Sequence, residues 1–238
     1  MNKAKALAQM IDHSILHPIL TDEDLRRECE VALKYRVASV CVKPYAVKQA
    51  VELLRNSEVL VGCVIGFPAG NSAIAVKVFE AETACKDGAV EMDMVINIGK
   101  ALQGDWNYIR EEIQSVTETC HHHGAIIKVI FETDFLSREA DIVKLCEICT
   151  EAGADYVKTS TGFGFIKQSN GDYNYLGATI PVLELMKSNV GPQVKVKAAG
   201  GVRTLDQLLD VQKAGCARCG ATATATIMED AIQRFGSY

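Results

Sequence analysis

The sequence predicts an α/β protein, a single (β/α)8 TIM barrel that spans residues 1–238 and begins with a short helix. Short β-branched runs alternate with amphipathic helical stretches along the chain, and strict alternation of this kind gives parallel strands. Eight such units fit into 238 residues, which favours a closed barrel over an open doubly wound sheet. The open sheet is usually marked by a glycine-rich turn in its first βα unit, and the sequence has none there. No linker rich in Pro, Gly or Ser divides the chain, so we expect one domain.

The expected strands are short runs rich in Val and Ile, bounded by turn residues. Six runs are clear, and the first and last of the eight are weaker. In chain order they cover residues 14–16, 39–42, 60–65, 90–96, 126–131, 155–158, 194–198 and 217–220. Because a helical stretch follows each run, all eight strands are expected to point in one direction.

The expected helices are amphipathic stretches between these strands. They cover residues 21–35, 46–55, 72–86, 105–123, 137–152, 179–187, 204–214 and 226–235. The first opens on Thr21-x-x-Asp24, a capping box whose side-chain oxygens accept the N–H groups left free at a helix N-terminus. Glycine follows four of the helices, at positions 88, 124, 153 and 215, where the left-handed conformation that ends a helix is needed.

Composition and charge limit the class of partner. The net charge of −5 leaves no broad basic face for nucleic acid or an anionic membrane, so we expect neither. No run reaches the roughly 18 apolar residues that span a bilayer, and the first ten residues lack the apolar segment of a signal peptide. Nine cysteines without an export signal predict reduced thiols and a cytoplasmic location. A phosphorylated small molecule is compatible with the charge, because it needs only local N–H donors and one or two cations.

Alternation along the strands places charged side chains inside the barrel. Neighbouring residues on a strand point to opposite faces, so Asp93 and Lys128 point inward when their apolar neighbours face the helices. The same parity puts Glu132, Lys195 and Lys197 inside, with Lys195 one layer deeper than Lys197. Such groups are costly to bury unless they pair with one another. A neutralising network that only fills the barrel would also explain them.

Three of the charged residues lie where this fold places its active sites. Asp93, Lys158 and Lys197 lie at or near the C-terminal ends of their strands. A free lysine amine, with a pKa of ~10.4, is mostly protonated at neutral pH, but burial and a second ammonium nearby both lower its pKa. We therefore expect Lys158 to form a Schiff base, Lys197 to lower its pKa, and Asp93 to move protons through a water molecule.

Two glycine loops predict a phosphate site at the same end of the barrel. The stretch 198–204 follows the seventh strand and opens a helix, so backbone N–H groups and the helix dipole can meet an anion. The loop 220–223 follows the eighth strand, and loops after strands seven and eight are the frequent phosphate site of this fold. Arg203 is the candidate for charge compensation. The candidate contacts are Gly162, Gly200, Gly201, Val202, Arg203, Gly220 and Thr222.

Seven stretches, in the same order along the chain, resemble the deoxyribose-phosphate aldolase family over essentially the whole length. They are DHSIL (12–16), VCVKP (40–44), VIGFPAG (64–70), EMDMVINIG (91–99), KVIFET (128–133), YVKTSTGF (156–163) and VKAAGGVRT (196–204). The run that begins at Lys158 is the most specific. The loop 220–223 departs from the family by carrying fewer hydroxyl residues than is usual.

The resemblance implies a class I aldolase that uses no metal or cofactor. It would interconvert 2-deoxy-D-ribose 5-phosphate with acetaldehyde and D-glyceraldehyde 3-phosphate in deoxyribonucleotide catabolism, a form of carbohydrate degradation. It implies the same catalytic roles for Lys158, Lys197 and Asp93. It also implies a C-terminal tyrosine, here Tyr238, on a tail that can reach the site. The accessory candidates are Asp12, Ser14, Cys41, Lys128 and Tyr238.

Two cysteine pairs have the spacing of zinc ligands. Cys146 and Cys149 lie inside an expected helix, and Cys216 and Cys219 straddle an expected strand, where positions three apart face opposite ways. We expect buried thiols rather than a metal site.

Two other functions fit the same barrel. One is an isomerase or lyase that binds a phosphorylated substrate and uses Asp93 and Glu132 as acid and base without an imine. The other is a catalytically silent regulator that binds a sugar phosphate. Borohydride with acetaldehyde would fix an adduct on Lys158 only in an aldolase.

A homo-oligomer, either a dimer or a tetramer, is compatible with the sequence, which does not determine the number of subunits.

Overall fold

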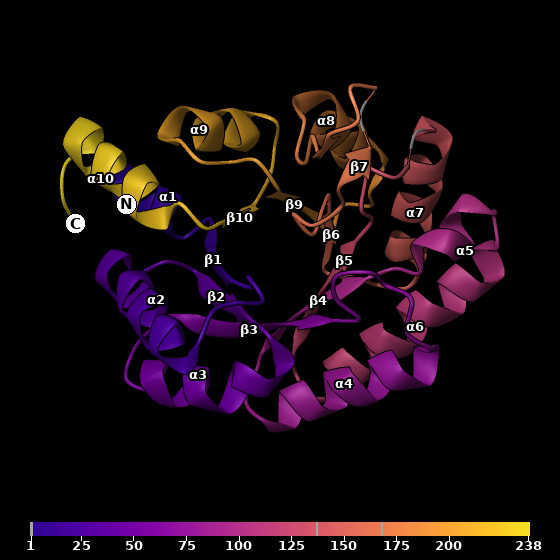
Figure 1. The fold of residues 1–238 in the computed structure, drawn as a ribbon, viewed down its shortest axis with the longest axis horizontal. Coiled ribbons are helices and arrows are strands. Elements are labelled where there is room, and N and C mark those ends of the chain that lie inside the picture. The colour runs from indigo at the N-terminus through magenta and orange to yellow at the C-terminus, as the bar shows by residue number, and fades with distance from the viewer. Residues whose placement is uncertain (1, 137, 168) are drawn as a thin grey trace.

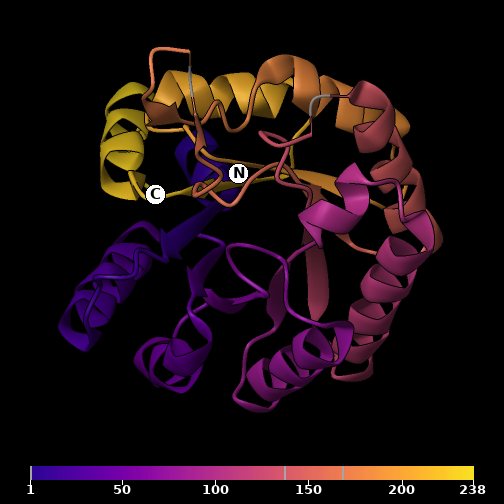
Figure 2. The same ribbon diagram turned by 45° about the vertical axis from the view of Figure 1, so that its right-hand side comes forward.

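The β-branched runs form a closed barrel of eight parallel strands, and helices enclose it (Figure 1 and Figure 2). The computed structural model describes residues 2–136, 138–167 and 169–238. Around the barrel the strand order is β1-β10-β9-β6-β5-β4-β3-β2. The strands are β1 (Ile11–Ile15), β2 (Ser39–Val42), β3 (Leu60–Ile65), β4 (Glu91–Val95), β5 (Ile126–Ile130), β6 (Tyr156–Lys158), β9 (Lys195–Ala199) and β10 (Arg218–Ala221). The predicted (β/α)8 fold is confirmed.

The helices lie close to their predicted ranges. They are α1 (Lys3–Ala8), α2 (Asp22–Tyr35), α3 (Val47–Leu54), α4 (Ile74–Lys86), α6 (Trp106–His122), α7 (Glu139–Glu151), α8 (Ile180–Asn189), α9 (Leu205–Lys213) and α10 (Thr224–Phe235). The short N-terminal helix is α1. The capping box of α2 is present, because the Thr21 hydroxyl accepts the Asp24 N–H and the Asp24 carboxylate accepts the Thr21 N–H. The four helix-ending glycines all have positive φ angles, as expected. Ser137, the first residue of one predicted helix, lies outside the described residues.

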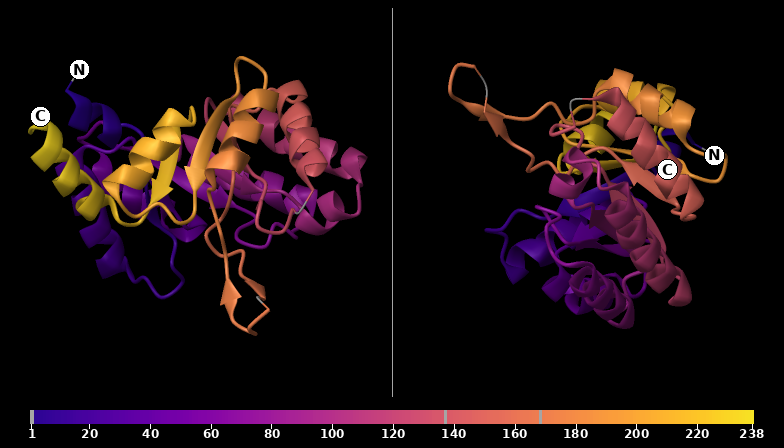
Figure 3. Two further views of the ribbon diagram at one scale, coloured as in Figure 1. Left: turned by 90° about the horizontal axis from the view of Figure 1, so that it is seen from above. Right: turned by 90° about the vertical axis from the view of Figure 1, so that its right-hand side faces the viewer.

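Three short elements were not predicted. They are the 3-10 helix η1 (Pro44–Ala46), the helix α5 (Ile98–Leu102), and a hairpin of β7 (Ile166–Lys167) and β8 (Tyr173–Asn174). Strands of two residues carry no measurable periodicity, which is why the sequence does not reveal them. Figure 3 shows the hairpin, in orange, projecting away from the barrel.

Two separate apolar clusters fill the molecule. The larger lies between strands and helices, and it includes Met92 and Met94, the outward-facing residues of β4. The smaller consists of Leu16, Cys41 and Val64, with two partly buried phenylalanines packed against it. No helix among the described residues is long and apolar enough to cross a membrane.

Candidate active site

Seven ionisable side chains meet inside the barrel, and each is almost fully buried. We call them the interior cluster. They are Asp12 of β1, Glu91 and Asp93 of β4, Lys128 of β5, Lys158 of β6, Lys197 of β9 and Arg218 of β10. Strand register brings them together, because Lys158 is paired with Lys197 and Asp93 with Lys128. Five of the seven are sequence candidates, while Glu91 and Arg218 were not predicted, although each lies two residues before a candidate on the same strand face.

The two lysines of the predicted catalytic set share one oxygen atom. Lys158 Nζ lies 2.7 Å from Asp93 Oδ2, and Lys197 Nζ lies 2.6 Å from the same oxygen. The two nitrogens are therefore no more than about 5 Å apart. Lys197 Nζ also lies 2.5 Å from Asp12 Oδ2. The structure thus brings together the three residues to which the sequence assigned imine chemistry.

A deeper layer of the interior cluster supports this set. Lys128 Nζ lies 2.5 Å from Glu91 Oε2, 3.1 Å from Asp12 Oδ2 and 3.2 Å from Asp93 Oδ1. The Arg218 guanidinium lies 2.9 Å from Asp12 Oδ1 and also donates to Glu91. Buried charges in a protein interior are tolerated when they are paired in this way.

Lys158 is the least paired cation of the interior cluster. Lys128, Lys197 and Arg218 each contact at least two carboxylates of the cluster, whereas Lys158 contacts only Asp93. Three carboxylates face four cations, so one positive charge of the cluster has no counterpart. Loss of one proton from Lys158 balances the cluster. Charge balance therefore favours a neutral amine at this position.

The pKa of Lys158 is lowered, and burial is the largest cause. The Asp93 carboxylate opposes this effect, and the Lys197 ammonium adds to it. The sequence analysis named burial and a second ammonium as the two causes, and both lower the pKa here, with burial the larger. For Lys197, burial acts to lower the pKa, but Asp12 and Asp93 outweigh burial and raise it. Lys197 is therefore held as a cation beside an amine that is easily deprotonated.

Asp93 is an anion held by three lysine side chains. Burial acts to raise its pKa, but Lys128, Lys158 and Lys197 together hold the pKa well below its ordinary value of 3.8. Within the described residues, Asp93 Oδ1 has no hydrogen-bond partner of good geometry, although the Lys128 ammonium is near it. This oxygen can accept a further hydrogen bond, while the other oxygen of the same carboxylate contacts Lys158.

Glu132 holds the loop that follows Lys158. Its backbone has a left-handed φ of 57°, and its carboxylate accepts hydrogen bonds from the Thr161 N–H and hydroxyl. A Cβ on Gly164 would lie 2.7 Å from the Glu132 carboxylate, so glycine is needed for this approach. Burial raises the pKa of Glu132. Its carboxylate is engaged with the loop, which weakens the alternative that uses it as a catalytic acid or base.

The predicted phosphate contacts lie around the same barrel end. Gly162, Gly200 and Gly201 have φ angles of 85°, 89° and 85°, a conformation that other residues rarely adopt. Gly220 lies close to the interior cluster, because a Cβ there would lie 3.5 Å from Lys197 Cε and 3.7 Å from the Ser14 hydroxyl.

The remaining phosphate candidates lie at the start of α9 and beyond β10. Arg203 and Thr222 are exposed, and Val202 is buried. The Arg203 N–H and the Thr204 N–H both donate to the Gln207 side chain, at 2.8 and 3.1 Å. Arg203 can therefore offer a guanidinium to an anion, but its backbone N–H is already used.

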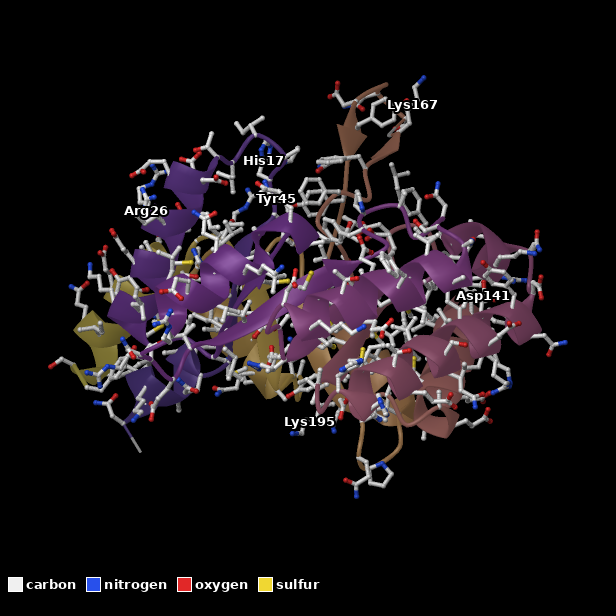
Figure 4. The ribbon with its side chains drawn as sticks, turned by 90° about the horizontal axis from the view of Figure 1, so that it is seen from below. His17, Arg26, Tyr45, Asp141, Lys167 and Lys195 are labelled. Carbon is white, nitrogen blue, oxygen red and sulfur yellow. The ribbon has the colours of Figure 1, made fainter. Side chains whose placement is uncertain are left out.

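The structure corrects the predicted place of Lys195. Lys195 is exposed, and its ammonium lies 5.6 Å from the centre of the Tyr156 ring. Figure 4 shows Lys195 at the end of the barrel opposite His17, Tyr45 and Lys167. Lys195 is the first residue of β9, so its side chain lies in solvent at the N-terminal rim of the barrel and not in a deeper interior layer.

Tyr238 also lies away from the interior cluster. Its hydroxyl donates to the Tyr35 carbonyl, 2.5 Å away, at the end of α2. The helix α10 runs for 12 residues from the mouth of the barrel, and Tyr238 is the third residue after it. A helix of this length covers about 18 Å, whereas three extended residues reach about 11 Å. The expected contact between the tail and the active site is therefore not made.

The cysteines behave as buried thiols. Cys41 lies in the smaller apolar cluster, and burial raises its pKa to about 11. Cys146, Cys149, Cys216 and Cys219 are buried without a disulfide. Over the described ranges, no group of three or more His, Cys, Asp or Glu side chains is placed to hold a metal ion.

Comparison with known proteins identifies relatives over nearly the whole chain. Residues 6–227 match the model of the DeoC/LacD family aldolases. The deoxyribose-phosphate aldolase of Rhodopirellula baltica is 46% identical over 230 residues, which cover 97% of this chain and 91% of that protein. That of Thermococcus gammatolerans is 47% identical over 227 residues, with coverage of 94% and 96%.

Solved structures agree with these relatives. The structure named QR15, an aldolase, superposes with a TM-score of 0.86 at 35% identity, covering 96% of each chain. The deoxyribose phosphate aldolase of Aeropyrum pernix, described as a unique tetrameric structure, gives a TM-score of 0.85 at 28% identity. That match covers 96% of this chain and 92% of the other.

Proposed function

The chain belongs to the DeoC/LacD aldolase family, and from that membership we propose that it is a deoxyribose-phosphate aldolase. It cleaves 2-deoxy-D-ribose 5-phosphate reversibly to acetaldehyde and D-glyceraldehyde 3-phosphate, in deoxyribonucleotide catabolism. The observation that supports this most is the sharing of one Asp93 oxygen by Lys158 and Lys197 inside the barrel. A neutral amine beside a fixed cation is the arrangement that Schiff-base chemistry requires.

The proposed reaction begins at Lys158. Its neutral amine attacks C1 of the open-chain sugar, and the carbinolamine loses water to give a protonated imine. The C3 hydroxyl then loses its proton, the C2–C3 bond breaks, and its electrons move into the imine to form an enamine. D-Glyceraldehyde 3-phosphate leaves, C2 takes up a proton, and hydrolysis releases acetaldehyde. The protein amine is the electron sink, so this route calls on no metal or cofactor.

Asp93 and Lys197 support these steps in different ways. We assign Asp93 to the proton transfers, through a water molecule, because its Oδ2 contacts Lys158 and its Oδ1 can accept a further hydrogen bond. Lys197 stays protonated between Asp12 and Asp93 and disfavours the ammonium form of Lys158. The accessory residues Asp12 and Lys128 keep this set in place.

The substrate phosphate is assigned to the loops after β9 and β10. The positive φ angles of Gly200 and Gly201 turn the backbone in a way that suits close approach to an anion. The exposed Arg203 guanidinium can add charge compensation. Gly220, within β10, lies near Lys197, and Thr222 follows the end of that strand.

The wider setting is part of the proposal. Residues 1–238 act as one domain on a small sugar phosphate in the cytoplasm, without a nucleic-acid or membrane partner. A homo-oligomer, a dimer or a tetramer, is supported by two exposed apolar residues three positions apart on α4. Val76 is 54% exposed and Phe79 is 68% exposed, as is typical of an apolar contact surface.

The test is turnover of 2-deoxy-D-ribose 5-phosphate by wild-type protein and by Lys158→Ala, with acetaldehyde and D-glyceraldehyde 3-phosphate both measured. We expect Lys158→Ala to lose at least about 1000-fold in rate while it keeps its fold. Lys195→Ala, the matched control, should keep the wild-type rate because Lys195 lies at the opposite rim. Unchanged turnover in Lys158→Ala would favour an acid–base enzyme, and substrate binding without turnover in the wild type would favour a regulator.

A further inference from the structure

The segment between β6 and α8 makes an excursion from the barrel and returns to it. Residues 165–167 leave the mouth of the barrel and form β7, and residues 169–178 include β8 and come back to the start of α8. Figure 4 places Lys167 on the projecting hairpin, at the same end of the molecule as His17 and Tyr45. The two legs meet at the base, where the Phe165 and Tyr175 rings pack edge to face with centroids 5.3 Å apart.

A single carboxylate holds the returning leg. Asp134, in the loop after β5, accepts the Leu176 N–H through Oδ1 at 2.5 Å. It also accepts the Gly177 N–H, at 3.2 Å to Oδ1 and 3.1 Å to Oδ2. The Ser160 hydroxyl donates to Asp134 Oδ2 at 3.4 Å. Asp134 thus joins the loop after β5 to the loop that follows Lys158 and to the base of the hairpin.

The backbone that Asp134 holds lies directly on Gly200. A Cβ on Gly177 would lie 2.5 Å from the Gly200 carbonyl oxygen, so no side chain fits between the two segments. The Ala178 N–H donates to the same carbonyl at 3.1 Å. On Gly200, a Cβ would lie 3.0 Å from Gly177 Cα and 3.5 Å from Ser160 Cβ. Gly200 is therefore enclosed by the segments that Asp134 ties together.

We propose that Asp134 is a positioning residue for the phosphate loop. Its carboxylate fixes the backbone of residues 176–177, which in turn fixes Gly200 and Gly201 at the place assigned to the substrate phosphate. The inference rests on the proposed function for that assignment. It makes Asp134 a determinant of the preference for a phosphorylated over an unphosphorylated sugar, although Asp134 does not touch the reacting atoms.

The kinetic test compares 2-deoxy-D-ribose 5-phosphate with unphosphorylated 2-deoxy-D-ribose. In Asp134→Ala we expect kcat/KM for the phosphorylated sugar to fall by about 10-fold or more relative to that for the unphosphorylated sugar, mainly through KM. Asp134→Asn keeps an acceptor oxygen for the two N–H groups and should stay within about threefold of wild type. Asp172→Ala is the matched control, because it removes the same charge from the hairpin, where Asp172 contacts Asn170 and, among the described residues, forms no hydrogen bond or ion pair with the barrel. Asp172→Ala should leave unchanged the ratio of kcat/KM for the phosphorylated sugar to kcat/KM for the unphosphorylated sugar.

A binding measurement separates failure of this inference from failure of the proposed function. Inorganic phosphate should raise the thermal midpoint of wild-type protein, Asp134→Asn and Asp172→Ala, and should raise that of Asp134→Ala much less. If Asp134→Ala keeps the wild-type ratio of kcat/KM for the phosphorylated sugar to kcat/KM for the unphosphorylated sugar, the positioning role is overturned. This includes the case in which both values fall by the same factor. If the wild type turns over neither sugar, the proposed function fails. The phosphate effect on the thermal midpoint then decides the positioning role by itself.

Discussion

Replacing Lys197 with Leu removes the cation that shares an Asp93 oxygen with Lys158 and tests how the amine is kept neutral. The two nitrogens are no more than about 5 Å apart, because both contact Asp93 Oδ2. At this distance and an effective dielectric constant of about 20, the repulsion between two ammonium groups is about 3 kcal/mol. Without this repulsion the ammonium form of Lys158 is less disfavoured, so its pKa rises. Without Lys197, the Asp93 carboxylate interacts more fully with Lys158, which also raises the pKa of Lys158. Burial continues to lower that pKa.

The readout is the pH dependence of kcat/KM for cleavage of 2-deoxy-D-ribose 5-phosphate. The reacting amine must be neutral, so activity rises as pH rises through the pKa of Lys158. In Lys197→Leu we expect this acid limb to move up by about two pH units. At a pH below both pKa values, kcat/KM should be lower by about 100-fold, and the deficit should narrow as pH increases.

Two further variants keep the test independent of folding. Lys197→Leu leaves Asp12 and Asp93 each with one buried cation fewer, so its thermal midpoint must be measured beside its activity. Lys197→Arg keeps the charge and should keep the acid limb near its wild-type position. Lys195→Leu, the same substitution at the exposed end of β9, should change nothing. A Lys197→Leu profile that is lower at every pH but has an unmoved acid limb would refute the electrostatic reasoning.

Three further predictions concern other candidates from the sequence. Burial acts to raise the pKa of Asp12, but its buried cationic partners lower it below 3.8, so its contribution to stability is present above about pH 4 and is lost as pH falls. In Asp12→Asn the urea concentration at the midpoint of unfolding should therefore decrease less than in the wild type as pH is lowered. The same decrease in both proteins would contradict this. The Cys41 thiol, with its pKa raised to about 11, should react with iodoacetamide at pH 8 about 100-fold more slowly than an exposed cysteine, as peptide mapping would show. Tyr238→Phe should leave kcat unchanged and cost about 1 kcal/mol of stability through the lost bond to Tyr35, whereas a large fall in kcat would restore a catalytic role for the tail.

Most of the barrel could be predicted because its strands are buried and regular. Alternation of apolar residues shows which side of β4 and β5 faces the helices, and it therefore places Asp93 and Lys128 inside, where the structure has them. The meeting of Asp93 with Lys158 and Lys197 follows from strand order and from their positions near the same strand ends.

Other features could not be predicted, because they depend on depth and on contacts between distant loops. Alternation along the strand predicts that the Lys195 side chain points into the barrel. Lys195 is the first residue of β9, however, and the structure shows that its side chain lies in solvent at that end of the barrel. Asp134 binds backbone N–H groups that lie 42 and 43 residues later, and such contacts leave no pattern in the sequence. The place of Tyr238 depends on the length and direction of α10.

The central claim is that Lys158 is the amine that bonds to the substrate carbonyl. Reduction with sodium borohydride in the presence of acetaldehyde, followed by peptide mass spectrometry, tests it most directly. We predict an ethyl group on Lys158 and loss of activity in proportion to the modification. Stable modification of Lys197 in place of Lys158, or no modification in a protein that still turns over the sugar phosphate, would contradict the account.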